Sequence, residues 1–574
     1  MDDLIRLSLS DWQYNAGIVG MYNVLKHSGK DIYEYTANYI NSGNEANIIA
    51  GYELCFPREY LNDFTDNYYR YMIDTYINQI SYGRILSYKE TAERILLLED
   101  SDFEDSKFSN ELFEGLNSYI KDTLKYYIKS ASYKAAFELI PNSDILLNRI
   151  LNLNTIKKGK KETILEKKDD IISVCNEILE IINILEGNLY RKYLGGKNII
   201  YTYLRRNWDG ISILNKQVKE KDIYKEFNNH FVKPTVEYLC ADKAKYKYKC
   251  FNCDSPIKNL DINYSFLTDT GFDTARKSSH VWFFQNDIAI CEFCKLVYAC
   301  MPAGFVYGFD KGIFINSNAN IDALISVNSK LKADMDNSVK NKDKNITYRS
   351  IVEAIIDRKE LGIQYELSDV QVVWYENEKY RFNILHESIL RIIYTSKEEF
   401  RLIKKATFKE NKVYIYLYEE TLKRIFNNQN LFLWINKLIH YYITNKSNCY
   451  YNISHVERIL KINFEYLKGV GLMENIEKDI IEKMRTYGYY IGKEYFKDGS
   501  DKKIVGLSHQ MLNALKTNNV NTFMDLLIRA YMYVKKEIPK DFINSLKTEE
   551  EFKTNGYAFV MGLNSYRGEI SDNK

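Results

Sequence analysis

The chain has 574 residues, of which 45% are hydrophobic and 27% charged, and a net charge of +2. One hydrophobic core cannot fill this length, so we expect two to four domains in a folded, soluble protein. The near-neutral charge argues against a protein that wraps nucleic acid by itself, because such proteins are usually strongly basic, but it leaves room for local basic patches.

No export or membrane signal is apparent. The first residues, MDDLIRLSLSDW, are acidic and lack the cationic stretch and apolar core of a signal peptide. No run of about 18 apolar residues follows, and the most apolar stretch, residues 431–443, is interrupted by Asn436 and Lys437 and predicts a buried helix. We therefore expect a cytoplasmic protein without a membrane partner.

Residues 1–150 predict a mixed but mainly helical region. Near its start, the small residues Ala16, Gly17 and Gly20 would allow two backbones to pack closely. Residues 169–187 predict a helix, because apolar residues recur at helical spacing after two aspartates and Gly187 supplies a stop.

Basic and aromatic residues gather between residues 190 and 249. Arginine binds phosphates or base edges in a bidentate manner, aromatic rings stack on bases, and the glycines at 195 and 196 would let the backbone approach a phosphate. The candidate nucleic-acid contacts here are Arg191, Lys192, Lys197, Arg205 and Arg206. The alternative is a solvated helix face. The lysine run around Gly159 is a weaker candidate, because such runs are usually exposed loops.

Four of the nine cysteines form two close pairs, Cys250 with Cys253 and Cys291 with Cys294. Two CxxC turns place four thiolates around one tetrahedral ion, which predicts a structural Zn²⁺ site. Such a closed shell leaves no position for a reacting water, so the site would stabilise the fold and not catalyse. The alternatives are a disulfide or two redox motifs; a cytosolic location and the missing thioredoxin-like context disfavour both. The other cysteines are assigned to packing: Cys55, Cys175, Cys240, Cys300 and Cys449.

The stretch between the two pairs, residues 254–290, is interpreted as an insertion that the metal pins at both ends. Arg276 and Lys277, followed by Ser278 and His280, make it a second candidate for nucleic-acid contact, with an ordinary surface loop as the alternative.

Strand signals then predict hairpins within residues 305–315 and 370–384 and a further strand at 412–418, and they stop after about residue 420. Thr522 and Asp525 predict a capping box for a helix that ends before Pro539. The expected fold class is α+β and mainly helical. We expect a mixed, mainly helical nucleic-acid-binding region (1–245), a β-rich four-cysteine zinc-binding subdomain (246–318), an α/β region with hairpins (319–420) and a C-terminal helical bundle (421–574).

No common enzyme signature is present. The chain lacks a phosphate loop, an HExxH motif, a His-Asp doublet of metal-dependent phosphohydrolases and a Gly-x-Ser-x-Gly elbow after a strand. We therefore expect a protein that is not an enzyme.

Two motifs far apart in the chain resemble one known family. They are Trp12 with the run Asn15-Ala16-Gly17-Ile18-Val19-Gly20, and the paired CxxC motifs followed by Ala303-Gly304-Phe305. In combination, and in chain length and helical tail, they resemble the CxxC–CxxC large-subunit family of type I-B CRISPR interference complexes, the Cst type.

The resemblance implies the large subunit of Cascade, an RNA-guided DNA-surveillance complex of antiviral defence. Such a subunit binds near the 5′ end of the guide RNA, recognises the flanking motif (the PAM) of target double-stranded DNA, helps to unwind it and supports recruitment of the helicase-nuclease. The implied partners are the CRISPR guide RNA, the target DNA, the helicase-nuclease, and the backbone, 5′-handle-binding, RNA-processing and small subunits of the complex. No short motif identifies PAM-reading residues, so Asn15 joins the candidate contacts on its chemistry alone.

A second product of the same gene is also predicted. In some relatives the helical tail is made separately from an internal start and serves as the small subunit. Here Lys468-Gly469-Val470 would encode a ribosome-binding sequence ahead of Met473, which predicts a separate polypeptide of residues 473–574. The alternative is an ordinary core methionine.

Two other function classes stay open. One is a metal-dependent nuclease whose acidic residues cannot be recognised by their spacing. The other is a zinc-ribbon protein of transcription or of a different defence system.

Overall fold

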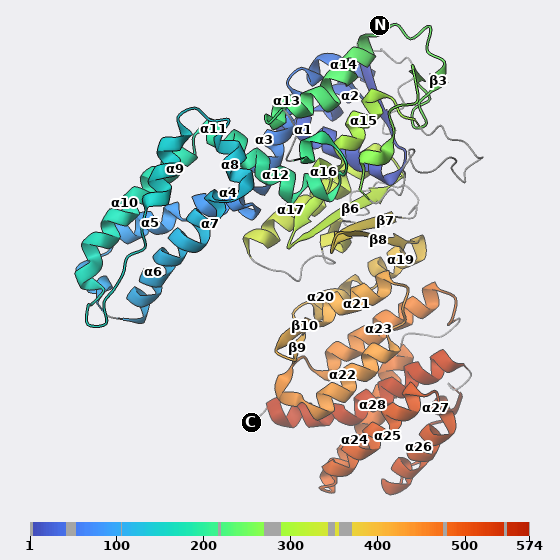
Figure 1. The fold of residues 1–574 in the computed structure, drawn as a ribbon. Helices are drawn as coiled ribbons and strands as arrows, with labels where there is room; N and C mark the ends of the chain where they lie inside the picture. Colours follow the sequence, from blue (N-terminus) through green and yellow to red (C-terminus); the bar gives the residue numbers. More distant parts are fainter. Residues whose placement is uncertain are drawn as a thin grey trace. The chain divides into compact units, whose positions relative to one another are not determined.

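The chain folds into a mainly helical α+β structure with small sheets, as expected from the sequence (Figure 1). The computed structural model describes residues 4–41, 53–104, 106–215, 220–268, 289–341, 350–354, 370–473, 479–544 and 548–572. The chain divides into two compact units. Unit 1 is Met1–Phe314 with Asn320–Ile325 and Tyr375–Tyr380, and unit 2 is Ile315–Ala319, Ser326–Trp374 and Arg381–Lys574. Across the described ranges, every helix is too short or too polar to cross a lipid bilayer.

Unit 1 begins with a two-stranded antiparallel sheet and a series of helices. The elements up to residue 152 are β1 (Leu4–Ser8), α1 (Trp12–His27), α2 (Ile32–Asn41), β2 (Glu53–Pro57), α3 (Phe64–Tyr76), α4 (Ser81–Leu86), α5 (Lys89–Leu96), α6 (Lys107–Ser118), α7 (Tyr126–Ile128), α8 (Ala131–Phe137) and α9 (Ser143–Asn152). The next elements are α10 (Lys168–Leu185), α11 (Asn188–Tyr190), α12 (Gly196–Thr202), α13 (Ile223–Phe227) and α14 (Lys233–Cys240). The predicted helix at 169–187 is confirmed by α10.

The four-cysteine segment follows α14. It consists of the short hairpin β3 (Tyr248–Lys249) and β4 (Pro256–Ile257) and the helices α15 (Glu292–Ala299) and α16 (Met301–Gly304). The predicted β-rich subdomain of residues 246–318 contains this hairpin and, after α15 and α16, the strands β5 (Val306–Gly308) and β6 (Lys311–Ser317).

Helix α1 is buried around most of its surface and belongs to the core of unit 1. Asp11 caps its start, accepting hydrogen bonds from the backbone N–H groups of Gln13 (2.8 Å) and Tyr14 (3.0 Å). The helix ends at His27, and Gly29 follows with a φ of +85°, a conformation that favours glycine.

Helix α3 holds the segment that follows the cysteines. The hydroxyls of Tyr68, Tyr71 and Tyr76 donate to the backbone carbonyls of Ala299, Ala303 and Phe305 at 3.3, 3.3 and 3.0 Å. These tyrosines are buried, so their polar ends need partners inside the fold. Many of the 49 tyrosines are therefore part of the core.

Both predicted hairpins are confirmed. Strands β5 (Val306–Gly308) and β6 (Lys311–Ser317) join through Phe309 and Asp310, and β7 (Val370–Glu376) and β8 (Lys379–Leu385) join through Asn377 and Glu378. All four turn residues have a positive φ, as two-residue turns of the I′ type require. The strands form one sheet in the order β5-β6-β7-β8. Helix α17 (Ile321–Lys340) lies between the hairpins in sequence.

Unit 2 ends in a helical bundle, drawn in orange and red in Figure 1. Its elements are α19 (Glu387–Thr395), α20 (Lys397–Ile403), β9 (Thr407–Glu410), β10 (Val413–Tyr416), α21 (Leu417–Phe426), α22 (Phe432–Thr444), β11 (Cys449–Tyr450), α23 (Ile453–Gly469), α24 (Asp479–Lys497), α25 (Asp501–Lys516), α26 (Val520–Tyr533), α27 (Lys540–Asn544) and α28 (Glu549–Asp572). The expected strand at 412–418 is β10, and the apolar stretch 431–443 forms the buried helix α22.

The predicted capping box at Thr522 and Asp525 is wrong. Helix α26 starts earlier, and Asn519 caps it by accepting a hydrogen bond from the N–H of Thr522 at 3.0 Å. Asparagine caps as well as serine or threonine, so the pattern alone did not locate the first turn.

Candidate metal centre and nucleic-acid interface

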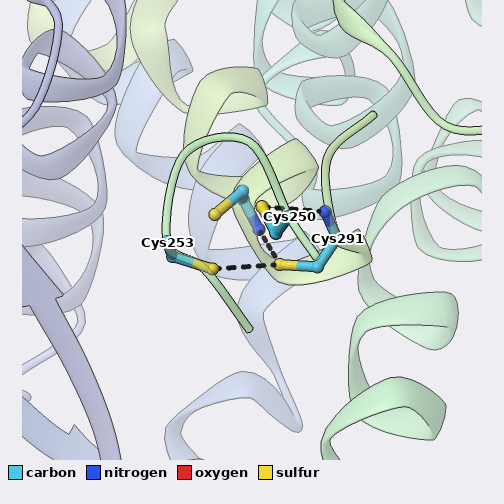
Figure 2. A group of neighbouring side chains, drawn as sticks. Cys250, Cys253 and Cys291 are labelled. Atoms are coloured by element: carbon cyan, nitrogen blue, oxygen red, sulfur yellow. Dashed lines mark hydrogen bonds between the residues drawn. The ribbon is translucent and has the colours of Figure 1, made fainter. Parts of the chain in front are cut away.

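The four paired cysteines meet in unit 1 and are positioned to hold one metal ion. The sulfur atoms of Cys250, Cys253, Cys291 and Cys294 all lie within 4.8 Å of one another. Figure 2 shows the sulfurs of Cys253 and Cys291 facing each other, 3.7 Å apart. A tetrahedron with metal–sulfur distances of about 2.3 Å has edges of about 3.8 Å, so the cluster fits a four-thiolate shell.

Local backbone structure places each pair. Cys250 follows β3, and its turn closes through the N–H of Asp254, which donates to the Cys250 carbonyl at 3.0 Å. Asp254 has a φ of +57°. Cys291 caps α15, so its sulfur accepts the N–H of Cys294 at 3.3 Å, while the sulfur of Cys250 accepts the N–H of Cys291 at 3.2 Å (Figure 2). These N–H groups favour sulfur in its charged, metal-binding form.

The two pairs are also joined by backbone hydrogen bonds. The N–H of Phe251 donates to the carbonyl of Ala289 at 2.8 Å, and the N–H of Ile290 donates to that of Ile262 at 2.9 Å. The ends of the insertion are thus held together by main-chain contacts at the cluster itself.

The thiols influence one another's pKa strongly. Hydrogen bonding from Cys250 and its neighbours lowers the pKa of Cys253 far below its usual value, whereas the hydrogen bond with Cys250 raises the pKa of Cys291. Cys253 is the exposed member of the four, and a metal would bind all four sulfurs as thiolates.

Two polar side chains that the sequence did not single out lie beside the cluster, and a third, Tyr298, bonds to the start of α1. The amide of Asn252, inside the first CxxC, lies 3.6 Å from the sulfur of Cys294, and the hydroxyl of Tyr14 lies 3.9 Å from the same atom. The hydroxyl of Tyr298 donates to the carboxylate of Asp11 at 2.5 Å. Burial raises the pKa of Tyr14 well above its usual value, so its hydroxyl keeps its proton.

The other cysteines mostly follow the expectation of packing. Cys55, Cys175 and Cys300 are buried, and Cys449 is half-buried. Cys240 is a correction, because it is exposed at the end of α14 and its sulfur accepts a hydrogen bond from Arg58 at 2.9 Å.

The amino-terminal motif and the segment after the cysteines pack directly on each other. A side-chain carbon at Gly17 would overlap the backbone carbonyl of Val297, and one at Gly20 would overlap that of Cys300. One at Gly304 would overlap the carbonyl of Ala16. The backbone of α1 therefore contacts the backbones of α15 and α16 directly. The small residues of α1 predicted such close packing, but the sequence did not identify the partner helices.

The first group of candidate nucleic-acid residues is largely engaged within unit 1. Arg191 pairs with Asp74 at 2.5 Å, and Lys192 pairs with Asp66 at 2.8 Å. Lys197 is half-buried, which lowers its pKa. Asn15 is fully buried, and its side chain exchanges two hydrogen bonds with the backbone of Ser10.

The expected role of the glycine pair is wrong. Gly195 and Gly196 are buried, where side-chain carbons would press against Ile73 and Ile223. The absence of a side chain at these positions serves helix packing, so the backbone is not open to a phosphate.

Arg205 and Arg206 line a surface cleft of about 1190 Å³ in unit 1. Arg205 is exposed, whereas Arg206 lies over the rings of Tyr203 and Tyr307 at 5.5 and 5.8 Å. The cleft also contains three carboxylates, from Asp209, Asp310 and Glu378. Two buried polar atoms at its wall, Nε1 of Trp208 and Oγ1 of Thr268, have no hydrogen-bond partner within the described ranges. Arg276 and Lys277 lie outside the described residues.

A comparison with known families places the four-cysteine segment. Residues 243–306 match a family described as CRISPR-associated protein (Cas_CXXC_CXXC). The match runs from just before β3 to the first residue of β5 and so contains all four cysteines, α15 and α16. No curated protein and no solved structure matches the chain. The metal-binding segment is therefore similar to that of a CRISPR-associated protein family.

Proposed function

We propose that the chain is the large subunit of a type I-B RNA-guided DNA-surveillance (Cascade) complex. In this role it binds near the 5′ end of the guide RNA, recognises the PAM of target double-stranded DNA, helps to unwind it and supports recruitment of the helicase-nuclease. It binds and scaffolds, and the cutting belongs to its partner.

The observation that carries this proposal is the packing of α1 on the segment that the CRISPR-associated family matches. The family resemblance rests on two motifs about 280 residues apart, and Asn23 on α1 donates to the carbonyl of Ala303 at 3.1 Å across that separation. Because Gly17, Gly20 and Gly304 form the contact between them, the two motifs are parts of one structural unit.

The cleft at Arg205 and Arg206 is the proposed DNA contact of unit 1. Exposed Arg205 is available to a phosphate, while the carboxylates of the cleft offer acceptors for base edges. A cleft that contains both an arginine and carboxylates suits contact with DNA bases and phosphates together better than contact with phosphates alone.

The experiment that tests the proposal is purification of the tagged chain from a host that carries the whole gene cluster. A guide RNA of uniform length and the other complex subunits should co-purify, and the isolated assembly should bind double-stranded DNA that carries the PAM. Incubation with labelled DNA and Mg²⁺ or Mn²⁺ should leave the DNA uncut until the helicase-nuclease is added. Purification as a lone chain with no RNA, or metal-dependent cleavage by the chain itself, would contradict the proposal.

The ion in the cluster is proposed to be Zn²⁺ with a structural role. Four thiolates in a tetrahedral arrangement are typical of structural zinc sites, and the ion would supply the cross-link that holds the two CxxC turns together. Elemental analysis of the purified chain should give one zinc per chain, and Cys250→Ser should lose the metal and assembly. Cys240→Ser, at an exposed cysteine outside the cluster, is the matched control. Full assembly without metal would refute the role.

The helical tail is proposed to be made twice, as the end of the full chain and as a separate small subunit starting at Met473. The support is the ribosome-binding pattern that Lys468-Gly469-Val470 would encode.

A further inference from the structure

Two polar side chains that are not metal ligands lie beside the sulfur of Cys294. Cys294 is fully buried, and the amide of Asn252 (3.6 Å) and the hydroxyl of Tyr14 (3.9 Å) both face its sulfur. A metal-bound thiolate carries no proton, so both groups would donate to it. Neither group is a ligand, and one comes from the metal-binding turn while the other comes from α1.

These contacts continue to the start of α1. The hydroxyl of Ser10, next to the residue that caps the helix, donates to the side-chain amide oxygen (Oδ1) of Asn252 at 2.5 Å. That capping residue, Asp11, also accepts the hydroxyl of Tyr298 from the far end of α15. The first turn of α1 is therefore bonded to both sides of the metal-binding segment.

The same helix meets α15 and α16 through main-chain contacts that leave no room for adjustment. Val297 lies one turn after Cys294 on α15, and its carbonyl sits where a side chain at Gly17 would be. A shift of α1 relative to α15 would therefore move the hydroxyl of Tyr14 away from the sulfur of Cys294.

We propose that Tyr14 and Asn252 are positioning residues of the metal centre, and that through them the retention of the metal and the docking of α1 on α15 and α16 stabilise each other. Hydrogen bonds to a ligand sulfur orient it and stabilise its charge. Because coupling between two binding events is reciprocal, a change in α1 that touches no ligand must also weaken the hold on the metal. The inference rests on the metal being bound, and not on the nucleic-acid role of the chain.

The first test removes the hydroxyl of Tyr14. The full chain, loaded with Zn²⁺, is mixed with a chromogenic chelator and the rate of metal release is recorded. Tyr14→Phe should release zinc roughly tenfold faster, in line with the effect of losing an outer hydrogen bond to a ligand. Tyr22→Phe is the matched control on the same helix, because its hydroxyl accepts a hydrogen bond from Lys26 at 3.0 Å and touches no cysteine.

The second test changes the packing of α1 without changing a residue next to the sulfur of Cys294. Gly17→Ala should also speed metal release, although Gly17 touches no ligand, because its added carbon overlaps the carbonyl of Val297. Gly115→Ala on α6 is the control, since its added carbon would meet nothing within 4 Å. Hydrogen exchange tests the effect of the metal on the helix. Removal of the metal by a chelator should raise the exchange rate in residues 12–27 and leave that of α10 unchanged.

Release rates for Tyr14→Phe and Gly17→Ala equal to that of the unaltered chain, or equal protection of α1 with and without metal, would overturn the coupling while leaving the zinc site in place. A purified chain that holds no metal would overturn the zinc site and the coupling together. Neither result depends on whether guide RNA co-purifies, so the nucleic-acid proposal is judged separately.

Discussion

Arg205 and Arg206 are neighbours in sequence but differ in what holds them. The guanidinium of Arg206 lies over two tyrosine rings and donates to the carbonyl of Asp310 at 3.5 Å, so it also supports the wall of the cleft. Arg205 is exposed and lines the same cleft. A change at Arg205 therefore reports on binding with less effect on structure than a change of both.

Arg205→Ala should weaken the binding of the assembled complex to double-stranded DNA and make its salt dependence shallower. The slope of log K against log salt concentration should fall by about 0.9 for one lost phosphate contact. The measurement is a DNA titration at several salt concentrations. Arg391→Ala is the control, because it removes the same charge from an exposed arginine of unit 2. An unchanged slope for Arg205→Ala would show that Arg205 does not contact a phosphate.

Single residues of the metal centre were predictable only where a spacing rule exists. The two CxxC pairs predict four metal ligands, because two thiolates must lie on a tight turn to bind the same ion. Nothing in the sequence marks Tyr14, which lies about 280 residues from Cys294 and meets it only through the packing of α1. Asn252 stands inside the motif, but a residue between two ligands can point toward the metal or away from it.

Among the elements, α24 and α28 of unit 2 pack closely against each other. A side-chain carbon at Gly488 would overlap the carbonyl of Phe559, and one at Gly562 would overlap that of Arg485. The two helices thus approach backbone to backbone, in the same way as α1 and α15 do in unit 1.

Gly488→Ala should destabilise unit 2 by about 1–3 kcal/mol, because the added carbon must push the two helices apart. Gly506→Ala on α25 should be neutral or slightly stabilising, since an added carbon there meets nothing within 4 Å and alanine favours the helix. The free energy of unfolding of both variants is measured by chemical denaturation of the full chain, with hydrogen exchange in α24 and α28 as the probe. Equal stability of the two variants would disprove the close contact.

Helices α22 and α25 meet at a pair of histidines. The rings of His440 and His509 lie 4.8 Å apart in a surface pocket that also contains Lys516. Burial first, and then the nearby His440, lowers the pKa of His509 below its usual value near 6.5. The folded protein thus holds His509 neutral where the unfolded chain already binds a proton.

The stability of this helix pair should be complete above about pH 6.5 and decrease as the pH falls from there toward the lowered pKa of His509. Exchange in α22 and α25, corrected for the intrinsic rate, should be faster at pH 5.5 than at pH 7.5. His509→Gln should lose much of this difference, and α10 in unit 1 serves as the internal reference. Equal protection at both pH values would contradict the prediction.

Elements were predicted well where local chemistry decides them. Short turns between alternating strands allowed both hairpins to be predicted, and their two central residues all adopt the positive φ that such turns require. The start of α26 was misplaced because Asn519 and Thr522 are both good caps three residues apart. The glycines at 195 and 196 were misassigned because the sequence does not say whether a missing side chain faces a ligand or another helix.

At the scale of the whole molecule, the tail of unit 2 depends on helices that precede Met473. Asn436 on α22 donates to the carbonyl of Leu512 (2.9 Å) and to the hydroxyl of Tyr557 (3.1 Å), and Phe432 stacks on Tyr557. Met473 itself is 4% exposed. A separate polypeptide of residues 473–574 would therefore expose a face that α22 covers in the full chain.

Intact-mass spectrometry of the purified complex should detect this polypeptide beside the full chain. Synonymous codon changes at Lys468-Gly469-Val470 that destroy the ribosome-binding sequence should remove the short product and leave the full chain unaltered. The same number of synonymous changes within α22 is the control. Recovery of no product starting at Met473 or at nearby Met484 defeats the idea.

The packing of α1 has a consequence for synthesis. Its partners, the carbonyls of Val297 and Cys300, are made about 280 residues later. At roughly 5–20 residues per second, the ribosome needs on the order of 15–55 s to reach them. During that interval, the apolar surface of α1 lacks these packing partners. A chaperone that shields it, or slow codons placed ahead of the cysteine turns, would therefore change the yield of active protein without changing a single amino acid.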